Sequence, residues 1–250
     1  MTPNPILKVL SIFNKFKVKS LLIGGQAAII YGAAEFSRDS DFIIFCSTKN
    51  IENLKKALAA LKAENIHIPP LEIDYLQRGH ACHFRCKAKE VEGLRVDVIS
   101  RLRGCDDFNK LWERRNTVSI RNGDVIYVLG LKDLVQSKET QCDKDWLMLK
   151  RLVENDVSLH KNSPSFEQIK WWLLESRNAE TLINLTQKYP EIAKECIGNR
   201  SILQEAVGQN AKQLKLRLDE EEGNERQKDI EYWQPLKKEM EALRHKMAQI

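Results

Sequence analysis

Residues 24–45 read GGQAAIIYGAAEFSRDSDFIIF, and this stretch decides how the first half of the chain is interpreted. Most of it is small and apolar, as expected for a chain that enters a buried core. Asp39 and Asp41 nevertheless stand directly before the apolar run 42–45, with only Ser40 between them. Because side chains at positions i and i+2 of a strand share a face, the two carboxylates are expected to point the same way.

A third acid belongs to this pattern. Asp97 lies in LRVDVIS (94–100), alone in an otherwise apolar strand, where an unpaired carboxylate is unfavourable. If the two strands are neighbours, three carboxylates converge on one face. They repel each other by about 4 kcal/mol per pair at 4 Å and an effective dielectric near 20, and a divalent cation would offset that repulsion. Such a cluster can hold magnesium, or two metal ions side by side.

Each acid also has an ordinary explanation. Asp39 and Asp41 could form a turn before the strand or cap a helix. Asp97 could be paired with Arg95 or Arg101. The metal interpretation is favoured because all three acids occur in order on suitable predicted elements.

The first 155 residues alternate between helix and strand patterns. Apolar residues recur at helical spacing over 6–16 and 50–65. SLLIG (20–24) predicts a short buried strand that ends in Gly24 and Gly25, where a helix begins. Residues 81–100 predict a hairpin with a break at EVEG, residues 124–130 another strand, and residues 131–155 a helix.

The later part of the chain contains little but helical patterns. We therefore predict an α/β domain over 1–157 and a helical domain over 158–250, with the polar, turn-forming segment 155–164 as linker. Gly223 and Pro235 interrupt the charged tail, which predicts two solvated helices, with a partner-binding helix as the alternative. Trp171 and Trp172 are adjacent, so only one of them is expected to face the core of its amphipathic helix.

The composition is that of a globular protein, with 42% hydrophobic and 30% charged residues among 250. The net charge of +5 suits an anionic partner such as a nucleotide or RNA. No apolar run approaches the ~20 residues of a membrane span, and lysines interrupt the apolar residues near the N-terminus, so neither a membrane contact nor a signal peptide is expected. Six scattered cysteines suggest a reduced, cytoplasmic protein.

HACHFRC (80–86) raises the question of a zinc site. Its candidate ligands are His80, Cys82, His83 and Cys86. On a strand His83 would point away from the other three, and no second Cys-x-x-Cys pair is present to complete a tetrahedral set. We expect these residues to be ordinary core or surface residues.

The order of these features resembles the DNA polymerase β-like nucleotidyltransferase superfamily. The matching segments are GGQAAIIYG (24–32), SRDSDFII (37–44) and RVDVIS (95–100), and the resemblance covers roughly residues 5–155. The sequence is similar in particular to the compact bacterial members of this superfamily, which include abortive-infection-type toxins and antibiotic-modifying enzymes. The resemblance implies an α+β fold, with a mixed sheet flanked by helices and followed by an all-helical C-terminal region.

The resemblance also implies a site and a reaction. Asp39, Asp41 and Asp97 would be catalytic and bind Mg²⁺ or Mn²⁺, while Gly24, Gly25, Ser37 and Lys138 would contact the nucleotide. An NMP would move from an NTP to an acceptor hydroxyl, on an RNA or tRNA end or on a small molecule, with release of pyrophosphate. An antitoxin is a further implied partner.

Two departures from the family pattern support an alternative. Glu35 and Cys142 stand where the family often has arginine. The alternative is a catalytically degenerate protein that keeps the fold and binds a nucleotide or a partner protein.

Overall fold

The computed structural model describes residues 5–34, 36–120 and 125–247, so Glu35 lies outside the described residues. The chain divides into two compact units. The first unit comprises residues 1–30, 34–137 and 232–250, and the second comprises residues 31–33 and 138–231. This division differs from the predicted boundary at 157/158, because residues 138–157 belong to the second unit and the last residues of the chain belong to the first.

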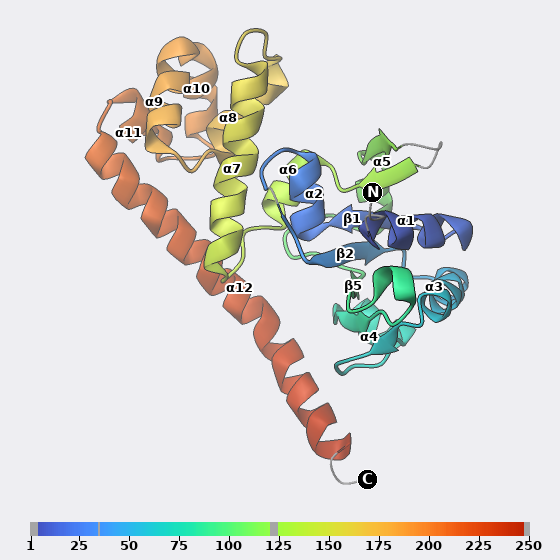
Figure 1. The fold of residues 1–250 in the computed structure, drawn as a ribbon. Coiled ribbons are helices and arrows are strands. Elements are labelled where there is room, and N and C mark those ends of the chain that lie inside the picture. Colours follow the sequence, from blue (N-terminus) through green and yellow to red (C-terminus); the bar gives the residue numbers. More distant parts are fainter. Residues whose placement is uncertain (1–4, 35, 121–124, 248–250) are drawn as a thin grey trace. The chain divides into compact units, whose positions relative to one another are not determined.

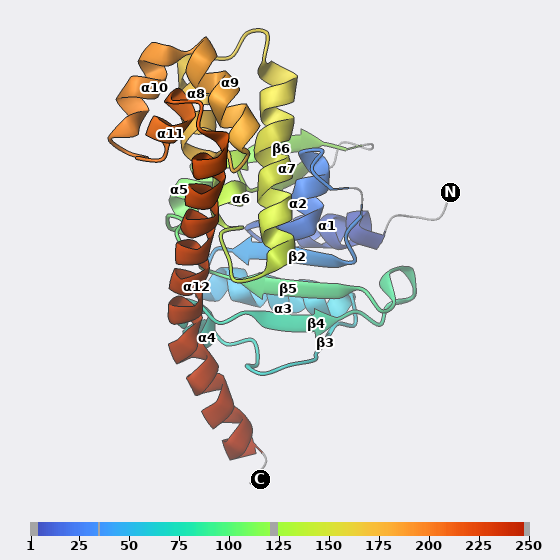
Figure 2. The same cartoon turned by 90° about the vertical axis from the view of Figure 1, so that its left-hand side faces the viewer.

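The first unit is built on a mixed sheet (Figures 1 and 2). Among the described residues it has seven strands in the order β3-β4-β5-β2-β1-β7-β6. Strand β2 pairs antiparallel with β1 and parallel with β5, and β4 pairs antiparallel with β5. The strands are β1 (Ser20–Ile23), β2 (Asp39–Ile44), β3 (Glu64–Asn65), β4 (Cys82–Arg85), β5 (Arg95–Ile99), β6 (Asn116–Ser119) and β7 (Val125–Val128).

Helices cover this sheet, as the α+β prediction requires. Phe42 of β2 packs on Phe13 of α1, with ring centroids 4.7 Å apart. Asn50 of α3 donates to the carbonyls of Lys19 and Phe45, which joins the helix to the ends of β1 and β2. The helices of this unit are α1 (Pro5–Lys15), α2 (Gly24–Ile30), α3 (Thr48–Ala60), α4 (Ile73–Arg78), α5 (Phe108–Glu113) and α6 (Leu131–Gln136), with a 3₁₀ turn at Lys89–Val91.

The second unit is entirely helical in its described residues (Figure 1). Its core contains the fully buried side chains of Trp146, Leu149, Trp172, Leu203 and Leu214. The helices are α7 (Asp143–His160), α8 (Phe166–Glu175), α9 (Ala179–Lys188), α10 (Pro190–Ile197), α11 (Leu203–Val207) and the beginning of α12 (Ala211–Met247). The predicted helical C-terminal region is therefore confirmed.

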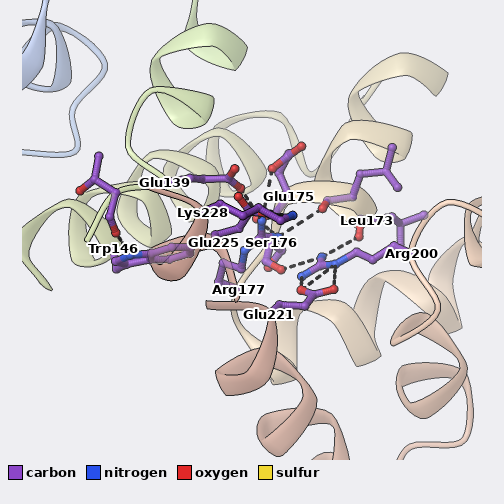
Figure 3. Close-up of polar contacts among 12 residues, drawn as sticks. Glu139, Trp146, Leu173, Glu175, Ser176, Arg177, Arg200, Glu221, Glu225 and Lys228 are labelled. Atoms are coloured by element: carbon purple, nitrogen blue, oxygen red, sulfur yellow. Dashed lines mark hydrogen bonds and ion pairs between the residues drawn. The ribbon is translucent and has the colours of Figure 1, made fainter. Parts of the chain in front are cut away.

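A buried arginine, Arg200, connects the end of α8 to α12 in the second unit (Figure 3). Arg200 donates to the carbonyls of Leu173 and Ser176 at 3.0 and 2.9 Å, and its guanidinium lies 2.7 Å from a carboxylate oxygen of Glu221 in α12. Nearby, Arg177 pairs with Glu139 at 2.8 Å, and both side chains are less than a tenth exposed. These charges satisfy carbonyls at the end of α8 that lack helical partners.

Three sequence predictions about the helices are wrong. Residues 131–155 form two helices, α6 and α7, separated by a turn. The first half of the predicted linker is helical, because α7 continues to His160. There Asn155 donates to the Tyr31 carbonyl at 2.6 Å, and Asp156 accepts from the Trp172 indole at 2.7 Å. Trp171 and Trp172 are both buried, at 8% and 1% exposure.

The tail also differs from the prediction. Instead of two helices broken at Gly223 and Pro235, α12 runs as one helix of 37 residues through both positions. Proline within a helix removes one backbone hydrogen bond and strains the preceding turn. Contacts on either side of it offset that penalty: Asp229 accepts from the Gln141 amide at 3.0 Å, and Glu239 lies 2.8 Å from His80.

None of the described helices combines the length and the apolar character that crossing a lipid bilayer demands.

Candidate functional site

The sheet brings the three predicted acids together. Asp41 of β2 and Asp97 of β5 are direct partners in the parallel register, and Asp39 lies two residues before Asp41 on the same face. All three side chains are partly exposed, whereas Ser40, between the first two, is fully buried on the opposite face. The predicted adjacency of the two acid-bearing strands is therefore confirmed.

Two basic residues share this surface, which we call the acid face: Asp39, Asp41, His83, Arg95 and Asp97. The guanidinium of Arg95 binds both oxygens of Asp97, through Nε and Nη2, each at 2.8 Å. His83 Nδ1 lies 3.0 Å from Asp97 Oδ1 and 3.1 Å from Arg95 Nη2. The pairing of Asp97 with Arg95, which the sequence left open, is the arrangement found.

The shifted pKa values follow from this pairing. Burial by itself raises the pKa of Asp97, but hydrogen bonds from His83 and Arg95, together with the charges of both groups, outweigh burial and lower it. The pKa of Arg95 is raised, first by its hydrogen bond to Asp97 and further by the negative charges of Asp97, Asp39 and Asp41. Arg95 is thus the counter-charge for all three acids.

The glycine corner packs directly against β2. Gly24 has a φ of +66°, and a Cβ at this position would lie 2.1 Å from an oxygen of Asp41. A Cβ on Gly25 would lie 2.5 Å from Ser37 Oγ. The Gln26 side chain donates to the Ser37 carbonyl at 2.9 Å, and Ser37 Oγ donates to the Asp39 carbonyl at 3.3 Å. Glycine is therefore required at both positions by close packing against Asp41 and Ser37. A contact of either glycine with phosphate stays a prediction.

The side chains of the acid face decide whether a metal ion can be held there. No group of three or more His, Cys, Asp or Glu side chains in the described part of the chain is arranged to hold one. On the acid face, Arg95 and His83 occupy the oxygens of Asp97. Magnesium, however, usually takes one or two carboxylates and completes its shell with substrate phosphates and water. A cage of three carboxylates does not fit while Arg95 pairs with Asp97, which leaves Asp39 and Asp41 as the candidate ligands of an ion that arrives with a triphosphate.

Lys138, the remaining predicted nucleotide contact, belongs to the second unit. It lies in the turn between α6 and α7, and its Nζ is 2.6 Å from Asp145 Oδ1. Thr140 donates to the other oxygen of Asp145 at 2.8 Å. With 14% of its side chain exposed, Lys138 is a paired residue and not an extended surface lysine.

The residues of the candidate zinc motif have separate surroundings. Cys82 and Cys86 are buried, and burial raises their pKa values to about 12 and about 11. His80 is 3% exposed and contacts Glu239, whereas His83 belongs to the acid face.

The sequence offered Arg95 as one possible partner of Asp97 but gave no indication of His83. The spacing Arg95-x-Asp97 was a usable signal, because it puts both side chains on one face of a strand. His83 had no such signal, since its register against Asp97 depends on the length and path of the loop between β4 and β5.

Comparisons with known proteins give a distant likeness. No model of a protein family matches the chain, and no curated protein sequence matches it. Among solved structures, the chain is similar to one described as "putative nucleotidyltransferase from H. pylori", with 13% sequence identity and a TM-score of 0.36. The match covers 86% of this chain and 94% of that chain.

Proposed function

We propose that this chain is a metal-dependent nucleotidyltransferase, which moves an NMP from an NTP to an acceptor hydroxyl and releases pyrophosphate. The observation that carries the proposal is the position of Asp39 and Asp41 on one face of β2, in register with Asp97 and against the Gly24 corner. Asp39 and Asp41 would hold Mg²⁺ or Mn²⁺, which when bound would order the triphosphate and neutralise part of its charge.

Arg95 has a role in this proposal that the sequence did not suggest. A triphosphate is a stronger competitor for a guanidinium than a single carboxylate, because it offers more anionic oxygens. Arg95 would therefore move from Asp97 to the phosphates when the nucleotide binds. It would supply positive charge that the family often takes from arginines at the positions of Glu35 and Cys142.

The release of Asp97 prepares the chemical step. Its freed carboxylate would accept the proton of the acceptor hydroxyl, and the hydroxyl oxygen would form a bond to the α-phosphorus. The bond between the α-phosphorus and the pyrophosphate oxygen would break, and pyrophosphate would leave with that electron pair. Gly24, Gly25, Ser37 and Lys138 are the proposed nucleotide contacts.

The test supplies each radiolabelled NTP with Mg²⁺ or Mn²⁺ to the full chain, together with total RNA or an aminoglycoside. We expect label to reach one acceptor with the unmodified chain and not with Asp39→Asn/Asp41→Asn. The exposed Asp74→Asn is the control, because it removes an acid of α4 that is not a member of the acid face. Transfer that persists in the double variant would contradict the mechanism.

A second candidate function has support from one observation. Because Arg95 and His83 already offset the charge of Asp97, the acids are tolerable without any metal. This is what a catalytically degenerate protein that binds a nucleotide or a partner, such as an antitoxin, would require. A thermal shift with Mg²⁺ and a non-hydrolysable NTP, combined with no transfer to any acceptor, would favour this second function.

A further inference from the structure

A pocket of about 380 Å³ lies beside the acid face, within the first unit. One wall is formed by His80 and Ala81, just before β4, and by His83 within it; the other is the stretch of α12 between Trp233 and Arg244. Its volume is in the range of small-ligand sites, which is roughly 300–1,000 Å³. Because His83 lines the pocket and also contacts Asp97 at 3.0 Å, the pocket adjoins the third acid.

Specific contacts hold the α12 wall in place. Glu239 of α12 is 2.8 Å from His80 Nε2 and 2.7 Å from Arg78. Gly79, with a φ of +101°, lies under the same helix, and a Cβ there would be 3.3 Å from the Tyr232 hydroxyl. Tyr232 and Glu239 are both partly exposed, and their contacts hold this stretch of α12 against residues 78–80.

The lining combines a flat aromatic ring with positive charge. Trp233, Leu236 and Met240 supply the ring and apolar surface, and Lys237 and Arg244 supply two cations against the single carboxylate of Glu241. No carboxylate among the described residues lies within ion-pair distance of Arg244. Aromatic rings stack on nucleobases, and lysine and arginine bind phosphate, so this lining suits a nucleotide. A polycationic small molecule would instead meet like charge.

We propose that this pocket binds the terminal nucleotide of a single-stranded RNA acceptor, with its base on Trp233 and its phosphate at Lys237 and Arg244. The binding of RNA to this pocket does not depend on the proposed function. Only the conclusion that the bound RNA end acts as the acceptor beside Asp97 rests on it. The proposal selects RNA over the small-molecule acceptor that the sequence left equally open.

The binding experiment uses the full chain and a short, unstructured, fluorescent RNA with a free 3′ hydroxyl. Lys237→Ala/Arg244→Ala removes the two cations of the pocket. The matched control is Lys238→Ala/Lys246→Ala, which removes two charges from exposed positions of the same helix outside the pocket lining. Trp233→Ala removes the ring, and Trp233→Phe restores an aromatic surface. Circular dichroism verifies that each variant is folded.

We expect RNA to bind about tenfold more weakly to Lys237→Ala/Arg244→Ala, with a shallower dependence on salt, and to bind nearly unchanged to the control. Trp233→Ala should weaken binding roughly tenfold, and Trp233→Phe should recover most of that loss. Equal losses in the two double variants would mean non-specific attraction and would overturn the proposal. So would no RNA binding at all, or displacement of RNA by an aminoglycoside or a peptide but not by unlabelled RNA.

A transfer assay separates this proposal from the proposed function. If both hold, Lys237→Ala/Arg244→Ala raises the KM for RNA about tenfold and leaves the KM for the NTP unchanged. If RNA binds through the pocket but neither RNA nor any other acceptor receives a nucleotide, the proposed function fails and the RNA site stands. If transfer to RNA occurs and the pocket variants change neither binding nor KM, the pocket proposal fails and the proposed function stands.

Discussion

Arg95 and Asp97 stand two residues apart on β5, and the guanidinium of Arg95 binds both carboxylate oxygens of Asp97 at 2.8 Å. The three acids of this sheet therefore have their own counter-ion before any substrate arrives. In the proposed reaction, this ion pair is the contact that must open for Asp97 to act, so the exchange of Arg95 between Asp97 and phosphate would link nucleotide binding to chemistry.

Replacing Arg95 should reveal the repulsion that it offsets. We expect Arg95→Met to lower the free energy of unfolding by about 1–2 kcal/mol in the presence of a chelator, a discounted value because a third of this side chain is exposed. The stabilisation by Mn²⁺ should in turn exceed that of the unmodified chain, because Asp97 becomes available. Arg151→Met, which removes an exposed arginine of α7 outside the first unit, is the control. Equal Mn²⁺ responses in all three proteins would show that Arg95 does not compete with a metal.

Gly24 should tolerate alanine less well than a glycine with similar backbone geometry. Gly24 has φ +66° and no room for a Cβ beside Asp41, whereas Gly93 has φ +78° and nothing within 4 Å. Gly93→Ala should destabilise by roughly 1 kcal/mol from backbone strain alone. Gly24→Ala should cost roughly 2–4 kcal/mol, since overpacking adds to the strain. Urea denaturation of the two variants measures the difference, and equal effects would contradict a close approach to Asp41.

The cysteines should differ sharply in reactivity. Burial raises the pKa of Cys82 to about 12 and of Cys86 to about 11, while Cys142 is exposed. Thiolate is the reactive form, so at pH 8 a disulfide reagent should modify Cys142 quickly and the two buried thiols only after unfolding. Cys142→Ser should abolish the fast phase. Rapid modification of Cys82 in the folded protein would show that β4 opens locally.

The raised pKa values of Cys82 and Cys86 also predict how the free energy of unfolding changes at alkaline pH. The ordinary pKa of about 9 applies to the unfolded chain, so above pH 9 the unfolded state binds fewer protons than the folded state. The free energy of unfolding should therefore fall as pH rises from about 9 towards about 12. Cys82→Ala/Cys86→Ala should flatten this part of the stability curve, and an unchanged slope would show that other groups cause it.

Arg200 should be far more important than a surface arginine of the same helical unit. Its side chain is 6% exposed, donates to two carbonyls and forms an ion pair with Glu221. The side chain of Arg217 is 42% exposed and pairs with the exposed Glu220. Removing one partner of a buried ion pair costs about 3–5 kcal/mol, and an exposed pair contributes less than about 1. Thermal unfolding of Arg200→Ala and Arg217→Ala should show this contrast, and similar melting temperatures would refute it.

Local sequence patterns were enough to predict many of the helices and strands of this protein. Helical spacing predicted α1 and α3, short apolar runs predicted β1 and β2, and alternating runs predicted the hairpin that contains β4 and β5. The glycine corner and the spacing of Asp39 and Asp41 were also readable, because each depends on neighbours along the chain. These features require only backbone geometry that repeats every two or 3.6 residues.

Only the tertiary structure decided which charges meet. The pairing of His83 with Asp97, the burial of both Trp171 and Trp172, and the passage of α12 through Pro235 all depend on partners distant in sequence. A local pattern states which face of an element is apolar, but not which other element will cover it or supply its counter-charge. Packing across the chain selects those partners, and it brought His83 of β4 to Asp97, beside the local partner Arg95.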